Sequence, residues 1–219
     1  MLEDIHAVNR FQQSAKGQEL LRSMEKKGIL GLTFWHNGMK QMSANKPLLL
    51  PSDAKGLKFR VQQSDVLVAQ MEALGATAQK LAFKEVYGAL QTGVVDAQEN
   101  TWSNIYSKKF FEVQDGVTET NHGILDYAVI VSRRFWDDLP KDIRADLERI
   151  LHEVTAERNK QSYDLNQASR AKILENGGAI RTLTPQQRAA WVAAMKPVWA
   201  KFEDEIGADL IAAAQASNK

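Results

Sequence analysis

Residues 56–104 read GLKFRVQQSDVLVAQMEALGATAQKLAFKEVYGALQTGVVDAQENTWSN, and the rest of the chain is arranged around this stretch. Residues 57–61 alternate apolar and charged side chains, which is the period of a β-strand. Residues 64–74 have a Ser cap and helical apolar spacing, and residues 83–90 predict a second short helix. Residues 94–95 predict another short strand, and the polar cluster 96–100 follows it. Strands that alternate with helices predict an α/β unit.

Arg60 is the unusual residue of the first strand, because its ionic head stands between apolar Phe59 and Val61. Such a side chain must either reach water or meet a partner. One interpretation is a surface arginine on a half-exposed strand. The other is a guanidinium that grips a carboxylate with two parallel hydrogen bonds, a geometry that lysine cannot reproduce. The residues alone leave both interpretations open.

The segments on either side extend the α/β pattern. Residues 3–27 have weak apolar stripes of helical spacing, and residues 29–35 predict a buried strand that His36, Asn37 and Gly38 break. Residues 117–120 and 127–131 predict two further strands.

The character of the chain changes after residue 132. Pro140 begins a helical pattern that continues without a breaker to Gly177, which predicts an unusually long helix. Residues 179–182 predict a short strand. Thr184 and Pro185 form a strong helix start, with a cap followed by Pro at the first position. The sequence therefore predicts an α/β fold with a largely helical C-terminal part.

Composition excludes several classes of protein. The 219 residues are 44% hydrophobic and 25% charged with a net charge of +1, and no basic run predicts a nucleic-acid partner. The longest apolar runs are far shorter than the roughly 20 residues of a membrane span. The absence of cysteine excludes disulfides and thiol catalysis. Residues 1–13 lack the features of a signal peptide, so we expect an intracellular protein or a chain without its true N-terminus.

The sequence contains only weak signals of an enzyme active site. The four histidines lie at no metal-ligand spacing, and no nucleotide-binding loop or nucleophile motif is present. Asp96 and Glu99 could form a general acid/base pair. We favour the interpretation that Glu99 orients its neighbours and Asp96 caps a turn. The sequence therefore predicts neither an enzyme nor a bound metal or cofactor.

Four motifs along the chain closely resemble the extracytoplasmic solute-binding proteins of TRAP transporters, the DctP family. They are Phe59-Arg60-Val61, Leu74-Gly75-Ala76, the run 82–100, and Thr120-Asn121-His122-Gly123. Segments 38–45, 102–106 and 135–140 are similar to the C4-dicarboxylate branch of that family. The resemblance covers nearly the whole chain, and its central motif is long and specific.

The resemblance implies a periplasmic-binding-protein-like (type II-like) fold, with two α/β lobes around a cleft that a long helix crosses. It places Arg60 on the ligand carboxylate, Asn100 as a hydrogen-bonding partner, Phe83 in the apolar wall and Lys40 as a charge facing the ligand. Weaker candidates from the same walls are Trp35, Trp102 and Asn104. Trp35 and Phe83 could instead be plain core, and Lys40 a surface charge.

The resemblance also implies that most of a first lobe is missing. Residues 1–34 would be a remnant of that lobe and a crossover, residues 35–132 the second lobe with the ligand wall, and residues 133–219 the long helix and C-terminal helices packing toward the first lobe. Core surface left exposed in this way would favour self-association. We therefore expect weak ligand binding by this chain alone.

The function that the resemblance implies is capture of a small carboxylate such as succinate, malate or fumarate in the periplasm, and delivery to the membrane permease of a TRAP transporter. An alternative is a sensing or interaction module that reuses the fold. A third and weaker one is an enzyme that uses Glu99 or Asp96.

Overall fold

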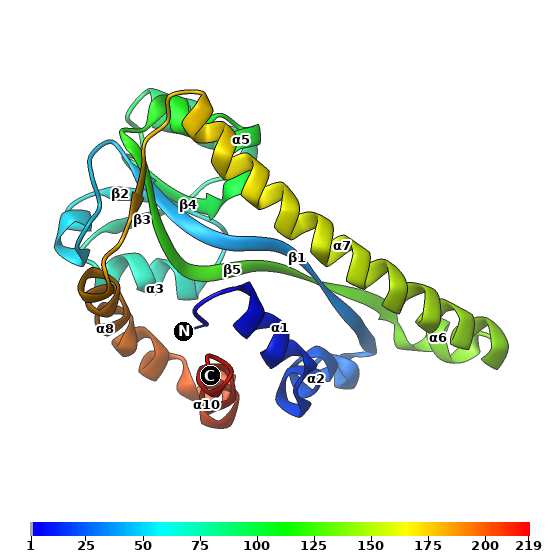
Figure 1. The fold of residues 1–219 in the computed structure, drawn as a ribbon. Helices are drawn as coiled ribbons and strands as arrows, with labels where there is room; N and C mark the ends of the chain where they lie inside the picture. Colours follow the sequence, from blue (N-terminus) through cyan, green and yellow to red (C-terminus); the bar gives the residue numbers. More distant parts are fainter. Residues whose placement is uncertain (1) are drawn as a thin grey trace.

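The computed structural model describes residues 2–219 and contains one mixed sheet with the strand order β3-β2-β4-β1-β5-β6. Two long antiparallel strands, β1 (Ile29–Ala44) and β5 (Gly116–Ser132), run through its middle (Figure 1). Along β1, only the second half pairs with β4 (Ala97–Thr101), and β6 (Ile180–Thr182) pairs with β5. The first half of β1 therefore has no strand partner on the side where β4 has ended.

The predicted α/β unit is confirmed. β2 (Lys58–Val61) runs parallel to both β3 (Thr77–Lys80) and β4, with α3 (Asp65–Ala73) between β2 and β3 and α4 (Val86–Gln91) between β3 and β4. The carboxyl ends of parallel strands meet at one edge of a sheet, which is where ligands of open α/β proteins bind. That edge carries the segments that follow Val61, Lys80 and Thr101.

Three strand predictions were wrong. The expected break at His36, Asn37 and Gly38 is a register shift inside one continuous strand, and the two strands expected at 117–120 and 127–131 are parts of β5. Gly38 absorbs the shift with a φ of 153°. The strand expected at 94–95 begins instead at residue 97, within the polar cluster. The pattern of apolar residues predicted the bounds of these strands poorly, because polar residues take part in the backbone pairing between strands as well as apolar ones.

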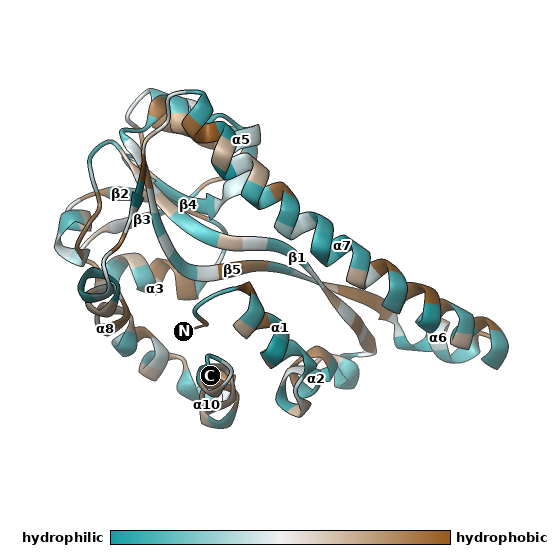
Figure 2. Cartoon of the chain, in the orientation of Figure 1, coloured by the Kyte–Doolittle hydropathy of each residue, from teal (hydrophilic) through white to brown (hydrophobic). Residues whose placement is uncertain are grey.

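The long helix is confirmed as α7 (Lys141–Glu175), with 35 residues. Figure 2 colours most of α7 as hydrophilic, and three of its four buried residues are small or polar, namely Ser162, Asn166 and Ser169. The fourth is Ile173, near the end of the helix. Its first half carries a stripe of apolar side chains that are 40–45% exposed: Ile143, Leu147, Ile150 and Val154. No helix within residues 2–219 is long and apolar enough to cross a membrane.

Helices cover both faces of the sheet (Figure 1). On one face, α3 and α8 (Pro185–Lys201) enclose a core that includes Met42, Phe59 and Trp191. On the other face, α4, α5 (Trp102–Ser107) and the end of α7 enclose a core that includes Val117. The remaining helices are α1 (Ile5–Gln13), α2 (Ala15–Arg22), α6 (Arg133–Asp138), α9 (Glu203–Ile206) and α10 (Ala208–Ala216).

Candidate functional site

Arg60 is buried at the end of β2, with 3% of its surface exposed. Its Nε and Nη2 atoms donate hydrogen bonds to the carbonyl oxygen of Leu81, at 3.0 and 2.8 Å. Its Nη1 atom is buried and has no hydrogen-bond partner among residues 2–219, and no carboxylate of that range forms an ion pair with the guanidinium. The surface interpretation of Arg60 is therefore wrong, and the strand holds a buried cation with an unused donor.

Burial lowers the pKa of Arg60, and the negative charge of Glu99 offsets part of that effect. Arginine nevertheless stays protonated in proteins, so the charge persists. A buried charge is costly unless an opposite charge and hydrogen bonds compensate it. The neighbouring position on β4 offers little compensation, because Gln98 leaves its own buried Oε1 atom without a partner. This arrangement favours an anionic ligand.

Asn100 lies on the same face of the sheet as Arg60, because β4 residue 98 is paired with residue 60 and side chains alternate along a strand. Its Oδ1 atom accepts hydrogen bonds from Nδ2 of Asn104, at 2.7 Å, and from the backbone N–H of Thr101, at 3.1 Å. Its Nδ2 atom makes no hydrogen bond within residues 2–219. The carboxamide is therefore fixed at its oxygen, and its nitrogen is left to donate.

Phe83 extends this cluster beyond the carboxyl end of β3. Its ring packs edge-to-face on Phe110, with centroids 5.9 Å apart, and the guanidinium carbon of Arg60 lies 6.0 Å from the ring centroid. Nζ of Lys108 lies 5.6 Å from the same centroid and forms no ion pair within residues 2–219. An aromatic ring thus lies near two cations that lack acidic partners, which makes the local potential positive.

Lys40 lies on the opposite face of the sheet. Its ammonium pairs with the buried carboxylate of Glu99, which also lies 3.3 Å from Nε2 of His122. Nδ1 of His122 lies 2.7 Å from the hydroxyl of Thr120, whereas the buried Oε1 atom of Glu99 has no hydrogen-bond partner within residues 2–219. The structure does not bring Lys40 together with Arg60, and contact between Lys40 and a ligand stays a prediction. The interpretation that Glu99 orients its neighbours agrees with these contacts.

Two groups of this cluster have shifted pKa values. Burial would raise the pKa of Glu99, but the hydrogen bond from His122 and the charge of Lys40 outweigh it and lower the pKa overall. Burial lowers the pKa of His122, against the opposing effect of Glu99. Because its pKa lies below the ordinary value, His122 is neutral at pH 7 in the folded state. We therefore assign Nε2–H as donor to Glu99 and Nδ1 as acceptor from Thr120.

We expect the folded state to lose stability as the pH falls below the ordinary histidine pKa of about 6.5. The unfolded chain takes up a proton on His122 in that range while the folded chain resists it, so acidification favours unfolding. Urea unfolding at pH 7.5 and 5.5 measures the effect. His122→Gln should reduce the pH dependence, and His152→Gln, at an exposed position on α7, should not. An equal pH dependence in wild type and His122→Gln would contradict the assignment.

The two tryptophans among the candidate residues, Trp35 and Trp102, lie at different distances from the Arg60 face of the sheet. Nε1 of Trp35 donates to the hydroxyl of Thr155 on α7, at 3.0 Å, in the half of β1 that β4 does not reach. Trp102 is buried two residues after Asn100, with the guanidinium carbon of Arg170 5.7 Å from its ring. The structure therefore brings Trp102 close to the Arg60 face and leaves Trp35 on a more distant part of β1. Direct ligand contact by either residue stays a prediction.

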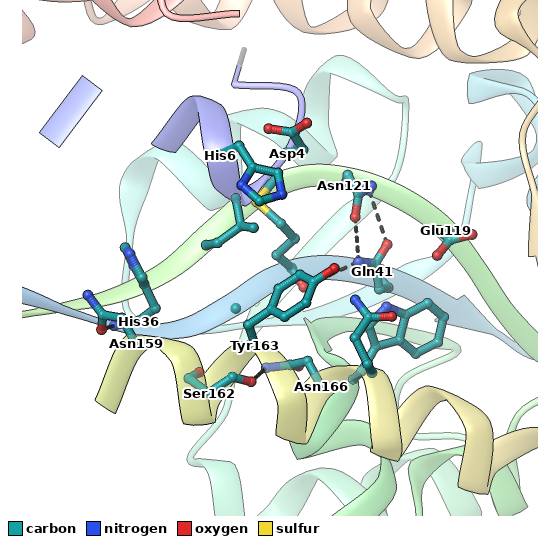
Figure 3. A pocket seen from close by; sticks show the side chains of 15 residues that line it. Asp4, His6, His36, Gln41, Glu119, Asn121, Asn159, Ser162, Tyr163 and Asn166 are labelled. Carbon is teal, nitrogen blue, oxygen red and sulfur yellow. Dashed lines mark hydrogen bonds between the residues drawn. The ribbon is translucent and has the colours of Figure 1, made fainter. Parts of the chain in front are cut away.

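A pocket of about 290 Å³ lies between α1 and α7, and residues of β1 and β5 also line it (Figure 3). Gln41 and Trp102 line it, which connects it to Asn100 because Gln41 is the β1 partner of that residue. Gln41 exchanges two hydrogen bonds with Asn121, at 2.6 and 3.1 Å. Sequence reasoning missed Gln41 and Asn121 as parts of a site, although both stand inside quoted motifs. Among residues 2–219, no group of His, Asp or Glu side chains is placed to hold a metal ion.

Comparison with known proteins gives a consistent result. Residues 1–205 match the DctP family, described as bacterial extracellular solute-binding protein, family 7. The chain is 63% identical, over 100% of its length and 66% of the relative's, to the C4-dicarboxylate-binding periplasmic protein DctP of Vibrio cholerae. It is 46% identical to the protein of that name from Rhodobacter capsulatus, over 99% of the chain and 66% of the relative.

Solved structures agree with these relatives. A TRAP periplasmic solute-binding protein from Shewanella oneidensis with bound succinate is 54% identical, with a TM-score of 0.93 over 99% of this chain and 71% of that one. One from Pseudomonas aeruginosa with bound L-malate is 48% identical, with a TM-score of 0.86 over 92% of this chain and 70% of that one. The chain thus spans 66% of the length of the curated relatives named above.

Proposed function

Because the chain belongs to the DctP family of bacterial extracellular solute-binding proteins, we propose that it captures a C4-dicarboxylate for a TRAP transporter. The observation that carries the proposal is the buried guanidinium of Arg60. Within residues 2–219 its Nη1 atom has no hydrogen-bond partner, and no carboxylate forms an ion pair with it. The names of the relatives and the succinate and malate bound to similar proteins support the choice of ligand.

The mechanism is binding and not catalysis. One ligand carboxylate accepts a hydrogen bond from Nη1 of Arg60, and the Nδ2 atom of Asn100 is the neighbouring donor on the same face. Phe83 provides an apolar wall next to the guanidinium. A hydrogen bond to a charged group contributes about 1.5–3 kcal/mol. The ligand-bound protein then delivers the acid to membrane permease subunits. This route requires that the protein be located in the periplasm.

Self-association is a second part of the proposal. The apolar stripe of Ile143, Leu147, Ile150 and Val154 on α7 is exposed, and such stripes pack against other surfaces when they can. In this chain a second copy could cover the stripe. Sedimentation of wild type and of Leu147→Glu/Ile150→Lys at several concentrations tests this point independently of ligand binding.

A thermal-shift screen of organic acids tests the proposed ligand class. We expect succinate, malate and fumarate to raise the melting temperature of a version extended at its N-terminus to the length of the relatives, because a ligand that binds only the folded state stabilises it. At 100 times its Kd, a ligand adds about 2.7 kcal/mol. The 219-residue chain should show a small shift or none.

Butyrate and succinamide serve as controls, because they match the carbon chain of succinate but lack one or both carboxylates. A shift of the extended version by succinamide that equals the shift by succinate would contradict carboxylate recognition. An equal shift by butyrate would contradict the need for a second carboxylate. Absence of any shift with all three dicarboxylates would contradict the proposed function. Micromolar or tighter binding by the 219-residue chain would contradict the expectation of weak binding.

A further inference from the structure

Asn37 in β1 joins the long helix to the end of β4. Its carbonyl oxygen accepts hydrogen bonds from Oγ of Ser162, at 2.7 Å, and from Nδ2 of Asn166, at 2.6 Å, both on α7. Its side-chain Oδ1 atom accepts a hydrogen bond from the hydroxyl of Thr101, at 2.6 Å, which is the residue that follows Asn100. One residue of β1 therefore links α7 to the strand that carries the ligand-facing carboxamide.

Asn166 of α7 also contacts α5. It is 6% exposed, and its Oδ1 atom accepts a hydrogen bond from the backbone N–H of Ser103, at 3.1 Å, in the first turn of α5. Its Nδ2 atom also donates to the carbonyl oxygen of Ser162, at 2.9 Å. The side chain lies so close to β1 that a Cβ atom at Gly38 would stand 2.7 Å from it. Among side chains of this size only a carboxamide offers both an acceptor and two donors.

The first turn of α5 determines where Asn104 lies. The backbone N–H of Asn104 approaches the hydroxyl of Thr101 at 3.4 Å, and its Nδ2 atom donates to Oδ1 of Asn100 at 2.7 Å. The contacts therefore run from Asn166 through the first turn of α5 to Asn104, and from Asn104 to the carboxamide of Asn100. The orientation of Asn100, and hence the direction of its unused Nδ2 atom, depends on that turn.

We propose that Asn166 is a positioning residue, which holds α5 so that Asn104 fixes the carboxamide of Asn100 for ligand binding. The part of this inference that concerns affinity rests on the proposed function. The part that concerns the carboxamides does not require a ligand.

Asn159 offers a matched control on the same helix. It also joins α7 to β1, because its Nδ2 atom donates to the carbonyl oxygen of Phe34, at 3.1 Å, and its Oδ1 atom accepts from the N–H of His36, at 2.9 Å. Within residues 2–219 its side chain makes no hydrogen bond to α5. Asn159→Ala therefore removes two helix–strand hydrogen bonds without touching the route to Asn100.

The first experiment follows the side-chain amide resonances of Asn100 and Asn104 by NMR without ligand. We expect Asn166→Ala to shift both amide pairs and to speed their hydrogen exchange, whereas Asn159→Ala leaves both unchanged. Unchanged resonances in Asn166→Ala would overturn the inference. If Asn166→Ala does not fold, Asn166→Asp replaces it, because it keeps the acceptor for Ser103, and a smaller shift of the same resonances is expected.

The second experiment measures succinate affinity by NMR titration in this chain and in the extended version. We expect Asn166→Ala to weaken binding about 3- to 10-fold, the usual consequence of losing one neutral hydrogen bond. Gln161→Ala, at an exposed position of α7 that does not line the pocket of Figure 3, should leave the affinity unchanged. In an Asn100→Ala background the effect of Asn166→Ala should fall below about 2-fold, because the two residues act on one contact.

The outcomes separate the inference from the function. An undiminished effect of Asn166→Ala in the Asn100→Ala background would mean a general effect on the fold, and it would overturn the positioning role. If neither wild-type version binds succinate, the proposed function fails, and the amide resonances alone decide whether Asn166 orients Asn100.

Discussion

Arg60→Ala should weaken succinate binding by the extended version by roughly 30-fold or more, and Arg60→Lys should recover little of that loss. Removing one member of a buried, hydrogen-bonded charge pair costs about 2–5 kcal/mol, because the other charge stays buried without compensation. Lysine keeps the positive charge but lacks the planar set of N–H donors of the guanidinium. Its ammonium could not donate to Leu81 and to a ligand from the same positions. Isothermal titration calorimetry measures the affinity.

Arg158→Ala is the matched control for this prediction. Arg158 lies on the exposed side of α7, and within residues 2–219 its side chain donates only to Gln161, so its loss should leave affinity unchanged. Circular dichroism should show the same secondary structure for all variants, which separates a lost contact from a lost fold. Unchanged succinate affinity in Arg60→Ala would remove Arg60 from the site and, with it, the observation on which the proposed function rests.

Glu99→Ala should lower the free energy of unfolding by about 3–5 kcal/mol, which is the usual result of breaking a buried ion pair. The cost arises because the ammonium of Lys40 stays buried without its carboxylate, and because Nε2 of His122 loses its acceptor. Urea unfolding followed by tryptophan fluorescence provides the measurement.

A second variant separates two causes of the expected loss of stability: the unpaired charge of Lys40 and the lost volume of the Glu99 side chain. Lys40→Met/Glu99→Leu removes both charges and keeps the volume, so it should recover most of the loss. The part that remains should come from Nε2 of His122, which still lacks its acceptor. Lys160→Ala, which breaks an exposed pair with Asp164, should leave the urea midpoint unchanged. A loss below about 1 kcal/mol in Glu99→Ala would show that the cluster of Lys40, Glu99 and His122 contributes little to the fold.

The two predictions address the two faces of the same sheet. Residues 99 and 100 are neighbours in β4, and alternation along a strand sends one side chain to each face. Glu99 therefore meets Lys40 and His122, whereas Asn100 meets Asn104 on the Arg60 face. The resemblance to known motifs placed Lys40, Arg60 and Asn100 in one site, and only strand register could reveal that Lys40 has its own acidic partner.

Several features followed from the sequence alone because they depend on neighbours along the chain. The long helix α7 was predicted from an uninterrupted pattern between Pro140 and Gly177, and the start of α8 from Thr184 and Pro185, whose capping box the structure contains. The α/β alternation around residues 56–104 and the family were also readable, because local periodicity and long motifs lie in consecutive residues.

Other features were decided by the tertiary structure. The length of β1 and β5 depends on pairing between residues about 90 positions apart, and bulges such as the one at Gly38 hide that continuity from any count of apolar residues. The burial of Arg60 without an acidic partner, and the contacts of Asn166 with Asn37 and Ser103, arise from elements far apart in the chain. The sequence determined which donors and charges the protein has, whereas packing decided which of them stay unpaired, because only the folded chain shows which partners come within hydrogen-bonding distance.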